Sequence, residues 1–142
     1  MAGYEITFSD APAREDLLAI EEGYAAFTRS QVGEADRREV AFFLRDANGS
    51  VVGGVKGEYS NYGWLWVGIL WVSDELRGRG YGTRLMGQIE QEAKRNGCTN
   101  VYLNSFSFQA VDFYKKLGYR VFGELEEFPP GHRVCSLTKE LS

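Results

Sequence analysis

The chain has 142 residues, of which 44% are hydrophobic and 25% charged, and its formal net charge is −4. That size and balance predict one soluble globular domain over residues 1–142, and the acidic charge argues against nucleic acid as a partner. No apolar run reaches the roughly 18 residues that a membrane-spanning helix needs, and the first residues lack the pattern of a secretory signal. Cys98 and Cys135 have no metal-ligand spacing, so we expect no metal and a reducing, cytoplasmic location.

The N-terminal part of the chain predicts a strand, two helices and a hairpin. Residues 4–8 alternate well enough for a strand, and Asp10 is expected to cap a helix with Pro12 in its first turn. Residues 31–39 are polar and predict a loop with a short second helix. Large apolar residues recur at helical spacing in the first helix and mark its buried face: Leu17, Ile20, Tyr24 and Phe27. The turn signal Asp46-Ala47-Asn48-Gly49 then predicts a hairpin with strands over residues 40–45 and 50–59.

A central strand is predicted over residues 64–72, where both alternating sets of side chains are apolar. The two sets are Trp64, Trp66, Leu70 and Val72 on one side, and Leu65, Val67, Ile69 and Trp71 on the other. A strand of this kind is covered on both faces and belongs in the middle of a sheet. Gly68 interrupts the strand and marks a bulge or a close backbone approach.

The rest of the chain predicts two helices and three strands. A helix with the apolar stripe Tyr81, Leu85, Ile89 and Ala93 ends at Asn96-Gly97, and a strand follows over residues 100–104. A second helix carries Ala110, Phe113, Tyr114 and Leu117 and ends at Gly118. Strands over residues 119–122 and 134–141 flank an acidic loop. The element order is β-α-α-β-β-β-α-β-α-β-β, which predicts an α+β fold with a mixed sheet of about seven strands, helices on both faces and a right-handed parallel crossover.

A glycine-rich turn joins the central strand to the helix that follows it, and its sequence is Arg77-Gly78-Arg79-Gly80-Tyr81-Gly82-Thr83. Glycines let a ligand approach the backbone N–H groups, and the helix start adds free N–H groups and the positive end of a dipole. With the two arginines these groups favour an anion, usually a phosphate. The spacing fits neither a P-loop nor a dinucleotide fingerprint. A tight structural turn with two solvated arginines is the alternative interpretation.

Two stretches resemble the signatures of the GNAT superfamily of N-acetyltransferases. Arg77-x-x-Gly80-x-Gly82 after Leu70-x-Val72 resembles the family's coenzyme A pyrophosphate loop. Residues 107–119 are similar to its second signature, N-x-x-A-x-x-F/L-Y-x-x-x-G-F/Y, with the alanine, the Phe-Tyr pair, the glycine and the last aromatic in register. Ser107 replaces the asparagine and is expected to cap the helix. The Phe-Gln-Ala-x-x-Phe-Tyr core is similar to that of small bacterial members, and the resemblance covers nearly the whole chain.

The resemblance implies acetyl-CoA as co-substrate and acetyl transfer to a primary amine by direct attack in a ternary complex. It places the pantetheine arm along the central strand, where a backbone N–H near Val72 faces the thioester carbonyl. The cofactor-binding residues that it implies are Leu70, Trp71, Val72, Arg77, Gly78, Arg79, Gly80, Tyr81, Gly82, Thr83, Ser107 and Tyr114. Tyr114 is also the implied acid for the departing thiolate. Periodicity alone favours the alternative that Tyr114 is a core aromatic residue.

The general base and the acceptor are left open. Glu58 and His132, the only histidine, are candidate bases; a solvated carboxylate, a loop histidine and a reaction without a base are the alternatives. The expected acceptor cleft for a small-molecule or peptide amine holds Tyr24, Phe27, Glu124, Glu126 and Glu127. The acidic residues could attract a cationic amine or form only a solvated face.

Three functions compete at this stage, and the oligomeric state, monomer or homodimer, is open. The first is the N-acetyltransferase. The second is a module that binds or senses acyl-CoA without turnover, against which the tyrosine at position 114 argues. The third is a nucleic-acid binder that uses Arg77, Arg79 and Arg84, which the net charge of −4 opposes.

Overall fold

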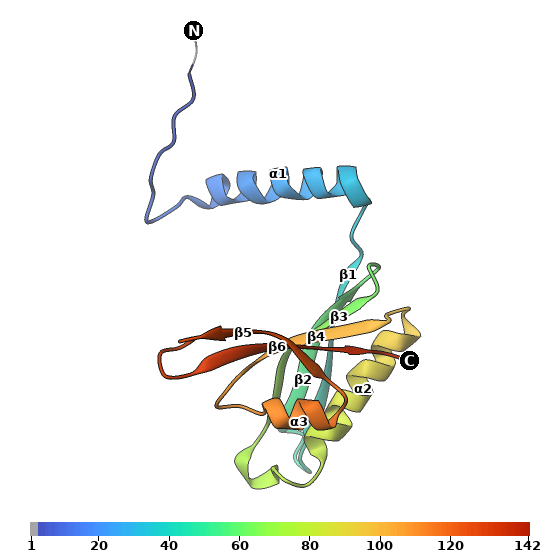
Figure 1. The fold of residues 1–142 in the computed structure, drawn as a ribbon. Helices are drawn as coiled ribbons and strands as arrows, with labels where there is room; N and C mark the ends of the chain where they lie inside the picture. Colours follow the sequence, from blue (N-terminus) through green and yellow to red (C-terminus); the bar gives the residue numbers. More distant parts are fainter. Residues whose placement is uncertain (1–2) are drawn as a thin grey trace. The chain divides into compact units, whose positions relative to one another are not determined.

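The computed structural model describes residues 3–142, and these divide into two compact units, one that ends at Ala35 and one over Asp36–Ser142. We call them the N-terminal and the C-terminal unit. The N-terminal unit holds one helix, α1 (Arg14–Val32), drawn in blue in Figure 1. The expectation of a single domain over residues 1–142 stays a prediction.

The N-terminal unit corrects three expectations. Residues 4–8 form no strand, because no described strand pairs with their backbone groups. The N-cap of α1 is Ala13 without a side-chain bond, so Asp10 does not cap it. No short second helix forms over residues 31–39, because Gly33, at φ 81°, ends α1 and a strand begins at Arg37.

The apolar stripe of α1 is also not buried. Its four residues are all classed as exposed, between 43% for Leu17 and 74% for Tyr24. Within the N-terminal unit no second helix or strand packs against this stripe. The periodicity predicted the helix correctly, but burial needs a partner surface that a periodic pattern does not supply.

The C-terminal unit is built on a six-stranded mixed sheet with the strand order β1-β2-β3-β4-β6-β5 (Figure 1). The strands are β1 (Arg37–Arg45), β2 (Val51–Ser60), β3 (Trp64–Val72), β4 (Asn100–Phe106), β5 (Arg120–Glu126) and β6 (Arg133–Glu140). Only β3 and β4 pair in parallel, through the crossover helix α2 (Tyr81–Arg95). The strand missing from the expected seven is the one over residues 4–8.

Both helices of the C-terminal unit cover the same face of its sheet. Ile89 of α2 and Tyr114 of α3 (Val111–Lys116) belong to one core with Leu65 and Val67 of β3. The expected helices on both faces are therefore not found in this unit. Trp64 lies on the other face and remains 40% exposed, so β3 is central in the sheet but, within this unit, helices cover only one of its faces. The sequence pattern predicted Trp64 and Trp66 as core residues, whereas both line a groove.

Gly68 does mark a bulge, and the bulge reverses the alternation of β3. Lys56 pairs with Ile69 and Gly57 with Val67, so Gly68 is the extra residue. Leu70 and Val72 consequently pack on the core with Leu65 and Val67, rather than on the side of the first two tryptophans. Opposite the bulge, a Cβ atom on Gly57 would lie 2.2 Å from the carbonyl oxygen of Trp66, so only glycine fits there.

In the predicted stripe of α2, Leu85, Ile89 and Ala93 are buried as expected, whereas Tyr81 at the start of the helix is only half-buried. The helix ends as expected, with Asn96 as C-cap and Gly97 at φ 88°. This helix is therefore fixed along its length against the sheet, which sets the position of the glycine-rich turn at its start.

Candidate active site

The parallel strands β3 and β4 separate at their carboxyl ends. They pair only from Trp64 to Val67 on β3 and from Asn100 to Leu103 on β4. Beyond that point β3 pairs with β2 alone and β4 with β6 alone. Among the described residues, no strand pairs with residues 68–72 on the side of β4. This free backbone edge contains Leu70, Trp71 and Val72, and an extended ligand could add to it as a strand does.

Arg77 ties the turn after β3 to the end of that strand. Its Nε donates a hydrogen bond to the carbonyl oxygen of Val72 at 3.0 Å, and its Nη1 lies 3.2 Å from a carboxylate oxygen of Asp74. Both charged side chains are exposed, at 62% and 88%, so the ion pair adds little stability. Part of the guanidinium that the sequence suggested as a phosphate ligand thus serves to shape the turn.

The glycines of the turn have two different roles. Gly80 is the N-cap of α2 at φ 87°, no side chain caps the helix, and a Cβ atom on Gly80 would meet nothing within 4 Å. The first N–H groups of α2 are therefore open to an anion. At Gly82, by contrast, a Cβ atom would lie 3.2 Å from the ring of Phe113. Gly82 thus lets α3 pack on the start of α2, a role that the motif did not indicate.

The other residues expected to bind the cofactor lie on the same segment or just before it. Gly78 and Arg79 stand in the turn, and Tyr81 and Thr83 lie in the first turn of α2. Just before them, the hydroxyl of Ser73 is buried and has no hydrogen-bond partner, the only such side-chain atom among the described residues. The open N–H groups at the start of α2 and the free edge of β3 suit the phosphate and the extended arm of coenzyme A, so the residues present fit this co-substrate.

Tyr114 lies on α3 in an aromatic cluster and is only 9% exposed. Its ring meets those of Phe113 and Tyr119 edge to face, with centroids 5.1 and 5.8 Å apart. Its hydroxyl forms no hydrogen bond with the part of the chain that the structure describes. Burial raises the pKa of Tyr114 above its usual value of 10.0. The phenol is therefore protonated near neutral pH, as a proton donor must be.

Ser107 does not cap α3, whose N-cap is Ala110 without a side-chain bond. Its N–H donates to the carbonyl oxygen of Arg133 at 2.7 Å, and its hydroxyl accepts from the N–H of Arg133 at 3.0 Å. The reason is that β4 continues to Phe106, so Ser107 ends a strand and closes the ladder to β6. Gln109 supports this corner by accepting from the N–H of Phe106 at 2.8 Å.

None of the contacts in the described part of the chain joins either candidate base to Tyr114. Glu58 lines a groove of about 270 Å³ with Trp64, Trp66 and Tyr102, on the sheet face opposite to α3. His132 lies between β5 and β6, edge to face with Phe108 at 4.9 Å. Their roles stay predictions.

The acidic residues expected in the acceptor cleft differ in their surroundings. Glu124 lies on β5, with Oε1 at 3.6 Å from both Nε of Arg133 and Sγ of Cys135. Glu127 follows β5 and accepts from the N–H of Gly131 at 3.3 Å. Glu126 is exposed at the end of β5. Arg133 therefore offsets part of the negative charge. Tyr24 and Phe27 lie on α1 in the N-terminal unit, and their role in acceptor binding stays a prediction.

Sequence reasoning missed a second groove on the same face as Glu58. Its volume is about 570 Å³, and Trp64, Tyr102 and Phe122 supply its aromatic lining. Because Trp64 and Asn100 begin the parallel strands, this groove lies at the end of β3 remote from the glycine-rich turn. No alternation signal could indicate it, since it depends on Phe122 lying two strands away from Tyr102.

Two further observations concern membranes and metal ions. Within residues 3–142 no helix is both long enough and apolar enough to cross a membrane. Across the same residues, His, Cys, Asp and Glu side chains form no cluster of three that could hold a metal ion.

Comparisons with known proteins connect this geometry to one family. Residues 4–119 match the family model described as acetyltransferase (GNAT) family. Blasticidin-S acetyltransferase of Streptomyces morookaense is 36% identical over 118 residues, covering 82% of this chain and 86% of the relative. The crystal structure of an acetyltransferase from Bacillus cereus ATCC 14579 has a TM-score of 0.88 and 33% identity, covering 95% of this chain and 98% of that one.

A more distant solved structure shares the fold. An aminoglycoside 6'-N-acetyltransferase complexed with coenzyme A is 21% identical, with a TM-score of 0.63 over 73% of each chain. The family match spans more than half of the chain and agrees with the divided parallel strands and the glycine-rich turn. The chain therefore belongs to the acetyltransferase (GNAT) family and is an acyl-CoA-dependent N-acetyltransferase.

Proposed function

We propose that this enzyme transfers an acetyl group from acetyl-CoA to a primary amine of a small cationic molecule, by direct attack in a ternary complex. One observation carries the proposal: β3 and β4 separate next to the uncapped start of α2, where a Cβ atom on Gly82 would lie 3.9 Å from the side chain of Leu70, and Tyr114 belongs to the core on the same face of the sheet. In this arrangement the turn from Arg77 to Thr83 holds the pyrophosphate and the free edge of β3 holds the pantetheine arm. The thioester then lies between β3 and α3.

Each step of the transfer is assigned to groups of this chain or to solvent. The neutral amine attacks the thioester carbonyl, a backbone N–H near Val72 stabilises the developing oxyanion, and a C–N bond forms. The C–S bond breaks as the phenol of Tyr114 gives its proton to the departing thiolate. Solvent restores the phenol proton, and the proton that the amine loses passes to Glu58, to His132 or to water.

The proposed acceptor class rests on charge and on a relative. Glu126 is exposed beside Glu124 and Glu127, and a cationic amine is attracted to such a cluster. A relative 36% identical to this chain is named for blasticidin S. The Phe-Gln-Ala core at residues 108–110 supports placement among the small bacterial members. We also place the enzyme in the cytoplasm, where its two buried free cysteines would stay reduced.

A panel of amines tests the function. The full chain is incubated with acetyl-CoA and with blasticidin S, an aminoglycoside, spermidine, free amino acids or a peptide with a free N-terminus, and released thiol is measured. We expect thiol release that depends on at least one small cationic amine and exceeds that with the peptide. Binding of acetyl-CoA without amine-dependent release would contradict the proposal and favour the sensing module.

The acidic residues give a second prediction, on the acceptor. Replacing Glu124, Glu126 and Glu127 together by glutamine should raise the acceptor KM about tenfold and weaken its dependence on salt. The reason is that the exposed carboxylates attract a cationic amine, and salt screens this attraction. Steady-state kinetics at two ionic strengths measures both effects. Glu140→Gln is the control, since Glu140 is an exposed carboxylate at the end of β6 opposite to the one that pairs with Glu124 and Glu126. Unchanged KM and salt dependence in the triple variant would reduce the cluster to a solvated surface.

A further inference from the structure

The helix that carries Tyr114 cannot by itself fix the ring. α3 has six residues, and its N-cap Ala110 offers no side-chain bond. Helices this short are marginal in water, and their geometry is set by what packs around them. The orientation of the phenol therefore depends on the neighbours of α3.

Tyr119 is the neighbour that connects Tyr114 to the rest of the core. It is 3% exposed, its ring meets that of Tyr114 at an interplanar angle of 72°, and its N–H donates to the carbonyl oxygen of Tyr114 at 3.0 Å. Its hydroxyl donates to Oε2 of Glu90 on α2 at 2.6 Å. One residue thus holds Tyr114 through its backbone and its ring, and is itself fixed to the helix that begins at the glycine-rich turn.

Lys139 on β6 pairs with Glu90 as well and balances the negative charge of its carboxylate. Its Nζ lies 2.8 Å from Oε1 of Glu90 and 5.4 Å from the ring centre of Tyr119. The side chain of Glu90 is 13% exposed, so its carboxylate needs both partners. Burial, reinforced by Glu90, raises the pKa of Tyr119, which keeps its phenol protonated and always the donor in this bond.

We propose that Glu90 and Tyr119 are positioning residues, which hold the ring of Tyr114 so that its hydroxyl reaches the departing thiolate. This inference rests on the proposed function, because it concerns the residue assigned there as the acid. A contact that served only stability would protect the fold without affecting turnover. The two cases differ because a positioning residue acts through the hydroxyl of Tyr114 and has no effect once that hydroxyl is gone.

A double-mutant cycle with Tyr119→Phe and Tyr114→Phe tests the inference. Tyr119→Phe keeps the ring contact and leaves the Glu90–Lys139 pair in place, so the fold should persist. We expect kcat to fall about tenfold with the affinity for coenzyme A unchanged, since small displacements of a catalytic group are costly. In the Tyr114→Phe background, the same change should alter kcat by less than about twofold. Assays are run well below the melting temperature of each variant.

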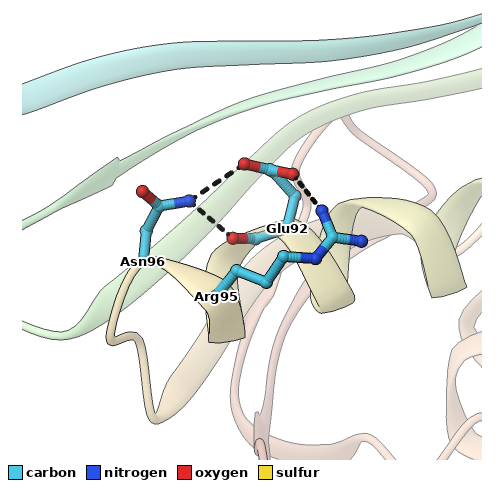
Figure 2. A network of polar contacts seen from close by, with 3 residues as sticks. All are labelled: Glu92, Arg95 and Asn96. Atoms are coloured by element: carbon cyan, nitrogen blue, oxygen red, sulfur yellow. Dashed lines mark hydrogen bonds and ion pairs between the residues drawn. The ribbon is translucent and has the colours of Figure 1, made fainter.

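Three further variants separate positioning from stability. Glu90→Gln retains an amide oxygen that can accept from Tyr119, so it should recover most of the kcat lost in Glu90→Ala. Glu92 is the matched control on α2, where its carboxylate accepts from Arg95 at 2.5 Å and from Asn96 at 2.9 Å (Figure 2). Glu92→Ala removes a comparable set of bonds and should lower the melting temperature with kcat unchanged.

The outcomes are distinct. Losses of kcat that multiply in the double variant, or a Tyr119→Phe protein that loses only thermal stability, would overturn the positioning role and leave the acid assignment intact. Full kcat in Tyr114→Phe alone would overturn the acid assignment, and the positioning role with it. The proposal is supported if Tyr119→Phe lowers kcat when Tyr114 is present and has little effect on kcat in the Tyr114→Phe background.

Discussion

Replacing Tyr114 by phenylalanine is expected to lower kcat roughly 10–10³-fold while the affinity for acetyl-CoA changes by less than about twofold. The change removes one oxygen and keeps the ring that packs against Phe113 and Tyr119. Since the hydroxyl has no hydrogen-bond partner in the described chain, its loss should cost little stability. A large effect on turnover would therefore come from the lost proton transfer.

Turnover, cofactor affinity and a thermal melt on this variant distinguish three roles. Loss of kcat alone supports the acid, loss of stability alone indicates a buried structural hydroxyl, and wild-type values in both leave the ring as core. Tyr62→Phe is the control, since Tyr62 is 45% exposed in the turn between β2 and β3. The raised pKa of Tyr114 also predicts a pH dependence. Because the phenol loses its proton only above its usual pKa of 10.0, we expect no loss of kcat from this group as the pH rises toward 10.

Local signals in the sequence predicted the elements that depend on near neighbours. The stripe of Leu85, Ile89 and Ala93 and the ending at Gly97 both act within one helix, and both are confirmed. The turn at residues 46–49 closes by a bond from the N–H of Gly49 to the carbonyl oxygen of Asp46. In these cases the physical cause lies within a few residues of the signal.

The errors arose where the cause lies elsewhere in the chain. The strand expected over residues 4–8 lacks a partner, and the exposed stripe of α1 lacks a packing surface within its own unit. A single inserted residue, Gly68, moved Leu70 to the other side of β3 than simple alternation predicted. Pattern alone gives the type of an element, and its burial follows from its partners.

In the candidate site too, the sequence indicated local features and missed contacts between residues far apart in the chain. The motif identified the turn, but it did not reveal that Gly82 makes room for Phe113 or that Ser107 closes a strand ladder with Arg133. The bond from Tyr119 to Glu90 spans 29 positions and the pair of Glu90 with Lys139 spans 49. No periodicity connects residues so far apart, so only the fold could bring them together.

The glycine-rich turn gives the largest expected effect on cofactor binding: Gly80→Val should reduce the affinity for coenzyme A at least about 100-fold. A β-branched side chain at the helix start would stand among the N–H groups that an anion must approach. The valine side chain would not clash with the rest of the protein, because a Cβ atom on Gly80 meets nothing within 4 Å. The substitution would still strain the backbone and lower stability, since φ at Gly80 is 87° and an L-residue in that region costs roughly 1–2 kcal/mol.

The control substitution must therefore cause the same backbone strain outside the glycine-rich turn. Gly97, at the other end of α2, provides such a position. Its φ is 88°, and it too has nothing within 4 Å of a Cβ atom. Gly80→Val and Gly97→Val should lose similar thermal stability, while calorimetry with coenzyme A should show lost binding only in the first. Equal affinity in the two folded variants would mean that the turn does not hold the pyrophosphate. Equal loss in both would mean that the strain in α2, rather than blocked backbone groups, weakens binding.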